Sequence, residues 1–180
     1  MDISAAPPRR LHVGGRTRTT GWEVMDAIAA PHVDHVGDAR DLRRFADGTF
    51  EEIYASHVLE HFDYATELPA ALQEWRRVLV DRGRLYVSVP DLDILAQLLL
   101  LKDQATMQER YEVMRMMFGG QRHEFDYHYV GLNEEFLAEF LRQAGFVRFR
   151  RVPALGIFED MSGFRFGGVP ISLNAIAEKA

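Results

Sequence analysis

The segment of residues 53–90 restricts the fold of this chain more than any other, because it alternates between two kinds of secondary structure. Residues 53–55 read as a strand, and so does the stretch 85–89, which Pro90 ends. Between these strands the apolar side chains follow a helical spacing, namely Leu68, Leu72, Trp75 and Leu79. Strands separated by helices are typical of open, mostly parallel sheets, so we expect an α/β fold.

The same alternation extends along the rest of the chain. Short strand candidates come first, at residues 11–13, 22–25 and 35–36. The later elements that we expect are helices at 92–102 and 104–118, a helix between Asn133 and Gly145, a strand at 146–152, a glycine-rich loop at 163–168 and a last strand at 171–177. Asp91 and Asn133 stand where helix N-caps are expected.

We therefore predict one domain over residues 1–180 with a Rossmann-like, open, twisted sheet that is mostly parallel and has an antiparallel last strand. Only residues 14–21 separate the first two strand candidates, which is too few for a crossover helix. The connections in the first half of the sheet are therefore expected to be abbreviated. We expect residues 1–9 to form a flexible N-terminus and residues 103–132 to form a lid over an acceptor.

Composition excludes several classes of function. The 180 residues carry a net charge of −6, which argues against a nucleic-acid partner. There is no cysteine, so a disulfide framework, a thiolate metal site and a thiol nucleophile are excluded. No apolar run has the length of a signal core or a membrane span. These features predict a cytoplasmic protein without a membrane partner.

Ligands of open parallel sheets bind at the carboxyl ends of the strands. In this chain that rule brings several residues to one edge of the expected sheet: Gly14 and Gly15, Asp26, Asp38, Ser56 and His57, and Pro90 and Asp91.

Five segments in order then resemble one family. They are LHVGG, GWEVMD, VGDARDL, FEEIYASHVLEHF and WRRVLVDRGRLYVSVPDL. Together they resemble the class I S-adenosylmethionine-dependent methyltransferases, and most of all the small type 11-like subgroup with a V-L-E-H turn after the fourth strand. The match covers roughly residues 10–100, and FLAEFLRQAGF with ISLNAIAEK is similar to the family's closing helix and strands.

The resemblance implies S-adenosyl-L-methionine as the cofactor. A glycine turn lets backbone amides approach the methionine part of this donor, and Gly14 and Gly15 match it. An acid at the end of the second strand can accept hydrogen bonds from ribose hydroxyls, and Asp26 matches it. The residues that match the adenine and the remaining donor contacts are Asp38 (with Asp41 as a rival), Ala39, Ser56 and His57. Each position also has a plainer interpretation, as a tight turn, a solvent-exposed aspartate or a turn cap.

Two departures from the family pattern favour an alternative. Arg16 replaces the last glycine of the usual G-x-G turn, where it either obstructs the donor or pairs with its carboxylate. The shortened first half leaves the pocket open or covered by a partner chain, such as a second copy in a homodimer. The alternative is a non-catalytic donor-binding or partner protein that kept the fold and lost turnover.

His57-Val58-Leu59-Glu60-His61 has two further interpretations, both of which involve metal. As H-x-x-E-H it matches a zinc-peptidase signature, but that requires both imidazoles on one helical face, and the preceding residues read as a strand. Some metal-assisted O-methyltransferases resemble the same turn. In that case His57, Glu60 and His61 would join His123 or His128 around a divalent ion, and an imidazole-rich set suits zinc better than magnesium.

The commoner outcome for the family is metal-free methyl transfer, in which alignment supplies much of the rate and a base removes a proton from the acceptor. His61 is the first candidate for this base and His128 the second, with Asp126 as an orienting partner. We expect a small-molecule acceptor that is methylated on oxygen or nitrogen. Because the family that this chain resembles includes proteins associated with sugars and glycans, the acceptor could be a sugar or a glycan precursor.

Overall fold

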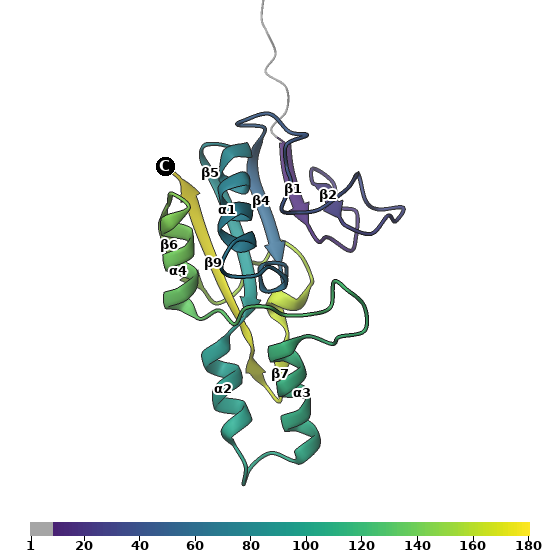
Figure 1. The fold of residues 1–180 in the computed structure, drawn as a ribbon, viewed down its shortest axis with the longest axis vertical. Coiled ribbons are helices and arrows are strands. Elements are labelled where there is room, and N and C mark those ends of the chain that lie inside the picture. The colour runs from purple at the N-terminus through teal and green to yellow at the C-terminus, as the bar shows by residue number, and fades with distance from the viewer. Residues whose placement is uncertain (1–8) are drawn as a thin grey trace, which may run out of the picture.

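The computed structural model describes residues 9–180, and these contain a seven-stranded sheet in the order β3-β2-β1-β4-β5-β9-β6 (Figure 1). The strands are β1 (Arg9–Val13), β2 (Glu23–Asp26), β3 (His35–Val36), β4 (Phe50–Ser56), β5 (Leu79–Pro90), β6 (Phe146–Val152) and β9 (Ser172–Lys179). Of the expected flexible terminus, only Arg9 lies within the described residues, where it begins β1.

Strand directions confirm the predicted fold class. The pairs among β1 to β5 are all parallel, and β9 runs antiparallel to both of its neighbours, β5 and β6. The helices are α1 (Glu67–Val78), α2 (Leu92–Leu100), α3 (Met107–Phe118) and α4 (Glu134–Gln143). Asp91 caps α2 and Asn133 caps α4, as the sequence predicts.

One face of the sheet carries the main core. Helices α1 and α4 lie over it (Figure 1), because each has an apolar stripe that is buried against the strands. Trp75 of α1 is fully buried, and its indole Nε1 donates to the Ala39 carbonyl at 2.7 Å. This bond ties the loop after β3 to the helix that follows β4.

The other face is covered in a different way. No helix occurs between β1 and β4 in the described chain, so the abbreviated first half is confirmed. The loop of residues 153–164 packs here instead, with Leu155, Ile157 and Phe158 against Trp22 and the tyrosines of β4 and β5. Phe158 also stacks on His12 of β1, with ring centroids 4.0 Å apart.

Three element boundaries differ from the sequence expectation. Strand β5 begins at Leu79, directly after α1, because its first residues pair with β4 before the apolar run starts. Helix α3 begins at Met107, because Thr106 and Glu109 form a capping box. The expected loop at 163–168 is instead part of a small hairpin, in which β7 (Arg165–Phe166) pairs with β8 (Val169–Pro170) across a turn of Gly167 and Gly168.

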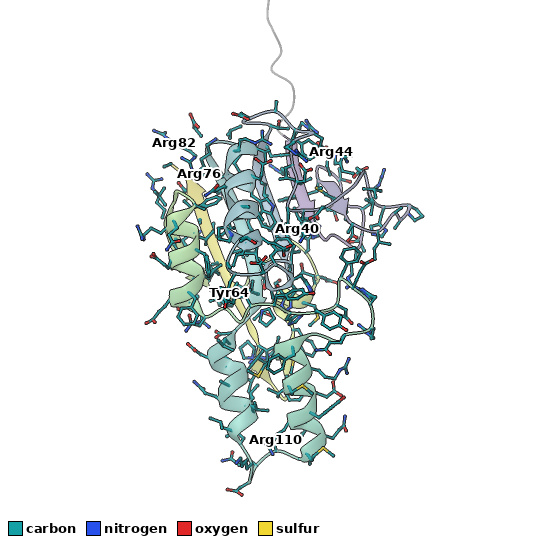
Figure 2. The ribbon with its side chains drawn as sticks, in the orientation of Figure 1. Arg40, Arg44, Tyr64, Arg76, Arg82 and Arg110 are labelled. Carbon is teal, nitrogen blue, oxygen red and sulfur yellow. The ribbon has the colours of Figure 1, made fainter. Side chains whose placement is uncertain are left out.

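Helices α2 and α3 form an antiparallel pair that projects from the sheet edge (Figure 1). Arg110, labelled at the far end of this pair in Figure 2, donates from Nε to the Leu99 carbonyl at 2.8 Å. Val113 and Leu95 are buried between the two helices and the strand ends. Among the described residues, no helix combines the length and the hydrophobicity needed to cross a bilayer.

Candidate functional site

The glycine turn after β1 is shaped by two close approaches. Gly14 has φ +72°, and its amide donates to the Met25 carbonyl of β2 at 2.8 Å. A Cβ at Gly14 would lie 2.9 Å from Val58, and one at Gly15 would lie 2.7 Å from the His12 ring. The turn therefore needs glycine at both positions. Arg16, the departure from the family pattern, has an exposed side chain.

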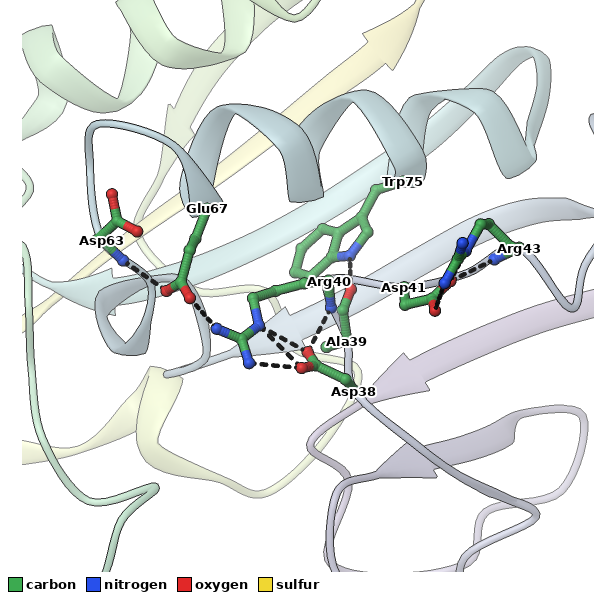
Figure 3. Close-up of polar contacts among 8 residues, drawn as sticks. All are labelled: Asp38, Ala39, Arg40, Asp41, Arg43, Asp63, Glu67 and Trp75. Atoms are coloured by element: carbon green, nitrogen blue, oxygen red, sulfur yellow. Dashed lines mark hydrogen bonds and ion pairs between the residues drawn. The ribbon is translucent and has the colours of Figure 1, made fainter.

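The two acidic positions have different surroundings. Asp26 ends β2, and its Oδ1 accepts the Ile28 amide at 2.8 Å. Asp38 is held by Arg40, whose guanidinium donates to both carboxylate oxygens and so lowers the pKa of Asp38 (Figure 3). Asp41 makes the equivalent pair with Arg43 and points away from Asp38 (Figure 3).

The loop carrying Asp38 and Ala39 is fixed by α1. Besides the bond from Trp75 to the Ala39 carbonyl, Arg40 reaches across from Asp38 to Glu67 in the first turn of α1 (Figure 3). The other oxygen of Glu67 accepts the Asp63 amide at 3.0 Å. Two contacts therefore hold this loop to α1, namely the Trp75 hydrogen bond and the Arg40–Glu67 ion pair.

β4 ends in a strained turn. His57 has φ +56°, which is uncommon for a residue with a side chain, and its amide donates to the Ser88 carbonyl of β5 at 2.8 Å. Ser56 precedes this turn, and its buried hydroxyl has no hydrogen-bond partner among the described residues. Because β1, β2, β3 and β4 are parallel neighbours, the glycine turn, Asp26, Asp38 and Ser56 share one sheet edge.

The hydrogen bonds of His57 define its tautomer. Ser172 donates its hydroxyl proton to the Met161 carbonyl at 2.9 Å, so it accepts from His57 Nε2 at 3.0 Å. The proton of neutral His57 is therefore on Nε2, and the Nδ1 lone pair faces the Glu60 carboxyl at 3.3 Å. Burial lowers the pKa of His57 to about 4, so the neutral form is present at physiological pH.

Glu60 lies in a short 3-10 helix, Leu59–His61, and its side chain is almost completely buried. Neither carboxyl oxygen has a hydrogen-bond partner among the described residues. The nearest ionisable group is the His57 ring, whose Nδ1 lies 3.3 Å from Oε1. In its neutral tautomer His57 has no Nδ1 proton to donate to an ionised Glu60. Burial raises the pKa of Glu60 to about 8.

His61 and His128 come together from distant parts of the chain. Their ring centroids are 4.9 Å apart in an edge-to-face arrangement. His61 Nδ1 lies 2.9 Å from the Tyr127 carbonyl and His128 Nδ1 lies 3.0 Å from the Met116 carbonyl. Because a carbonyl can only accept, both rings are protonated on Nδ1 and keep a lone pair on Nε2. Burial lowers the pKa of both, that of His128 to about 4.

A cavity of about 260 Å³ adjoins these histidines. His57 and His128 line it, together with apolar residues such as Met161 and Ile171. α3 and the loop that follows, within the stretch 103–132 expected to form a lid, contribute the ion pairs Glu112–Arg115 and Arg122–Asp126. His61 does not line this cavity.

Several expectations about the histidine turn need correction. His57 and His61 do not share the face of an α-helix, because His57 directly follows β4 and only residues 59–61 are helical, in a 3-10 turn. The zinc-peptidase interpretation is therefore wrong. His123 is exposed and takes no part in the cluster, which contains His128 instead. Asp126 orients neither histidine, since it is bonded to Arg122.

Sequence reasoning missed the groups that orient these side chains. Backbone carbonyls of Met116 and Tyr127 hold the two Nδ1 atoms, and Ser172 holds His57. A carbonyl partner leaves no trace in residue identity, so the sequence carries no signal for it. His12 was also missed, although a histidine two residues before a glycine turn could have been noted.

Comparison with known proteins shows which folds and domains this chain is similar to. A family model described as a methyltransferase domain matches residues 17–87. The chain is similar in structure to a methyltransferase dependent on S-adenosylmethionine from Archaeoglobus fulgidus, at 14% identity and a TM-score of 0.60, covering 96% of this chain and 86% of the other. For one from Thermotoga maritima the identity is 18%, the TM-score 0.59 and the coverage 97% and 84%.

A third similar structure is the CurJ carbon methyltransferase, with 15% identity and a TM-score of 0.56. The alignment covers 98% of this chain but 50% of the CurJ chain, so this chain spans half the length of that relative. No curated protein matches the chain in sequence. At these identities the solved structures establish the fold, and the activity has to be argued from the site.

The strand order, with one antiparallel strand in an otherwise parallel sheet, is that of the Rossmann-like methyltransferase fold. The matched segment at residues 17–87 is similar to a methyltransferase domain, and the solved structures share the fold of S-adenosylmethionine-dependent methyltransferases.

Proposed function

We propose that this chain transfers a methyl group from S-adenosyl-L-methionine to an oxygen or nitrogen of a small molecule. The observation that carries the proposal is the position of the histidine-lined cavity. His57 follows Ser56 at the end of β4, so the edge that holds the glycine turn continues directly into the cavity wall. A donor on that edge would stand beside an acceptor in the cavity.

The residues of the edge fit the donor. Glycine at positions 14 and 15 lets the turn pack directly against Val58 and His12, and the turn lies at the carboxyl end of β1, where ligands of parallel sheets bind. Asp26 has one carboxylate oxygen engaged by a backbone amide, so the other can accept from ribose hydroxyls. Ala39, Ser56 and His57 would complete the contacts. Asp38 would need to share its carboxylate between Arg40 and the adenine amine.

S-adenosylmethionine supplies the methyl group on a sulfonium, which is already activated for transfer. The chain then has to hold the acceptor and take up a proton. His128 suits that role because it lines the cavity and keeps a lone pair on Nε2 at neutral pH. His61, which the sequence favours as the base, touches His128 edge-on and is the second candidate.

Calorimetry with S-adenosylmethionine and S-adenosylhomocysteine tests donor binding. We expect one site per chain, and about tenfold to hundredfold weaker binding in Asp26→Asn because the ribose hydrogen bonds lose their charged acceptor. Asp103→Asn, in the exposed connection between α2 and α3, is the matched control. Absence of binding by the wild-type chain at millimolar donor would refute the proposal.

For the acceptor we propose a sugar or glycan precursor. The support is the mixed lining of the cavity, which combines methionine and isoleucine with guanidinium–carboxylate pairs. A pyranose ring has C–H groups and a rim of hydroxyls, and these two kinds of side chain can contact them. A panel of monosaccharides and phenols with labelled donor tests this choice, and methylation of phenols alone would contradict it.

A second candidate is a non-catalytic donor-binding or partner protein that forms a homodimer. Two observations favour it: the first half of the sheet lacks crossover helices, and Arg40 already occupies the Asp38 carboxylate. Donor binding without turnover across the acceptor panel would select this function. Sedimentation velocity, with and without donor, tests the homodimer.

A further inference from the structure

Three metal-ligating side chains converge beside the cavity. Glu60 and His61 come from the 3-10 turn after β4, and His128 comes from the loop after α3. One ligand atom of each lies within 4.8 Å of the others. The two segments are fastened together, because the Tyr129 amide donates to the Glu60 carbonyl at 2.7 Å.

Both imidazoles are oriented as metal ligands are. A histidine that binds a metal through one ring nitrogen usually donates the other N–H to a carbonyl or carboxylate, which fixes its tautomer. Here the Tyr127 and Met116 carbonyls hold the two Nδ1 atoms, so both lone pairs are on Nε2. Together the two bonds leave each ring with one neutral nitrogen, Nε2, that can donate its lone pair to a metal.

Glu60 supplies the second and independent observation. Its side chain is 1% exposed, and both of its oxygens are buried without a hydrogen-bond partner in the described part of the chain. The nearby His57 cannot supply a proton, because its only N–H points to Ser172. A buried carboxyl with no partner is costly, and a coordinated cation is one of the few groups that would satisfy it.

We propose that Glu60, His61 and His128 bind a divalent transition-metal ion of the zinc class. Two imidazoles and one carboxylate are a donor set that zinc accepts, whereas magnesium and calcium prefer oxygen alone. Three protein ligands leave one position of a tetrahedral ion for water or for the oxygen of an acceptor. A bound ion would take up the Nε2 lone pair of His128, so this histidine would then not serve as the base proposed above. The site stands on this geometry alone and does not require that the chain transfers methyl groups.

Titration of the purified full chain with zinc tests the site. The protein is prepared without an affinity histidine tag, stripped with a chelator and titrated with ZnCl₂ in a calorimeter. We expect one ion per chain, and about 100-fold weaker binding in His61→Ala and His128→Ala, since each loses one of three ligands. His123→Ala, which removes an exposed histidine of the same loop, should bind as the wild type does.

Cobalt(II) gives a readout that does not depend on activity. The visible absorption of bound cobalt should be that of a four-coordinate ion in the wild type and should be lost in Glu60→Gln, which preserves the shape of the side chain. Circular dichroism of each stripped variant establishes that it is folded. No zinc binding by the wild type, or equal loss in His123→Ala and His128→Ala, would overturn the site. Neither result would bear on donor binding, which is measured with the chelated protein.

Discussion

At the scale of single residues, His12 shows how the chain covers its sheet without helices. Its ring is buried between the Gly15 backbone and Phe158, and Nδ1 has no hydrogen-bond partner within the described residues. Burial lowers the pKa of His12 to about 4. Protonation of this ring therefore opposes the packing of the loop that covers the sheet.

The sign of the pH dependence follows from this pKa. The folded chain holds His12 neutral, whereas an unfolded chain has an imidazole pKa of about 6.5. The stabilising contribution is complete above pH 6.5 and is lost as the pH falls through about 4. We expect His12→Phe to lose less stability than the wild type between these pH values, by on the order of 2 kcal/mol. Urea unfolding measures the difference, and equal slopes would contradict it.

Gly119 determines where the loop carrying His128 starts. It has φ +83°, and a Cβ there would lie 2.2 Å from the Asp126 carbonyl oxygen. We expect Gly119→Ala to destabilise the chain by about 2–4 kcal/mol, because the backbone must move. Gly163→Ala, with open space around the added atom, is the control. The thermal unfolding midpoints of both variants measure the difference. Equal midpoints would show that the positive φ of Gly119 is not needed for stability.

At the scale of elements, the loop of residues 153–164 takes the place of crossover helices. Phe158 packs this loop against the sheet through ring contacts with His12, Trp22 and Tyr54. Asp160 adds a polar contact, since it accepts the Tyr54 hydroxyl at 2.7 Å. A single loop thus buries the aromatic face of three strands.

Phe158→Ala should therefore destabilise the chain by about 2–4 kcal/mol, since it removes an aromatic ring from a packed cluster. Phe125→Ala is the control, because the Phe125 side chain is 47% exposed. Denaturant unfolding followed by tryptophan fluorescence measures both, and Trp22 reports on the cluster directly. If both variants unfold at the same denaturant concentration, the loop does not hold this face.

The sequence predicts elements well where the signal is local. The stripe of Leu68, Leu72 and Trp75 and the caps Asp91 and Asn133 are local, and their helices are where expected. The covering loop was not predicted, because its role depends on which face the other elements leave bare. For the site, the sequence offered both His123 and His128. Long-range bonds between the two segments, such as that from the Tyr129 amide to the Glu60 carbonyl, place His128 beside the turn.

At the scale of the whole molecule, the order of the strands across the sheet differs from their order along the chain. β9 is the last strand along the chain, yet it lies between β5 and β6. β6 reaches the rest of the sheet through β9, and α4 packs on β6. Strand pairs so distant in sequence fold slowly, since a long loop must close first.

A chain ending at Ile171 should therefore lack a stable fold. Without β9, both β5 and β6 lose a partner, and Leu173, Ala175 and Ala177 leave the core. We expect rapid digestion by a dilute protease and loss of cooperative thermal unfolding. The Phe158→Ala chain, which keeps β9, is the comparison. Protection equal to that of the complete chain would contradict this expectation.

The position of β9 also has a consequence during translation. Until residues 172–179 have left the ribosome, the growing chain presents two open strand edges, on β5 and on β6. Open edges pair readily with other chains, so this interval is when the nascent protein is most exposed to aggregation. Chaperone occupancy on ribosome-bound chains should accordingly peak before β9 emerges and fall once it has inserted.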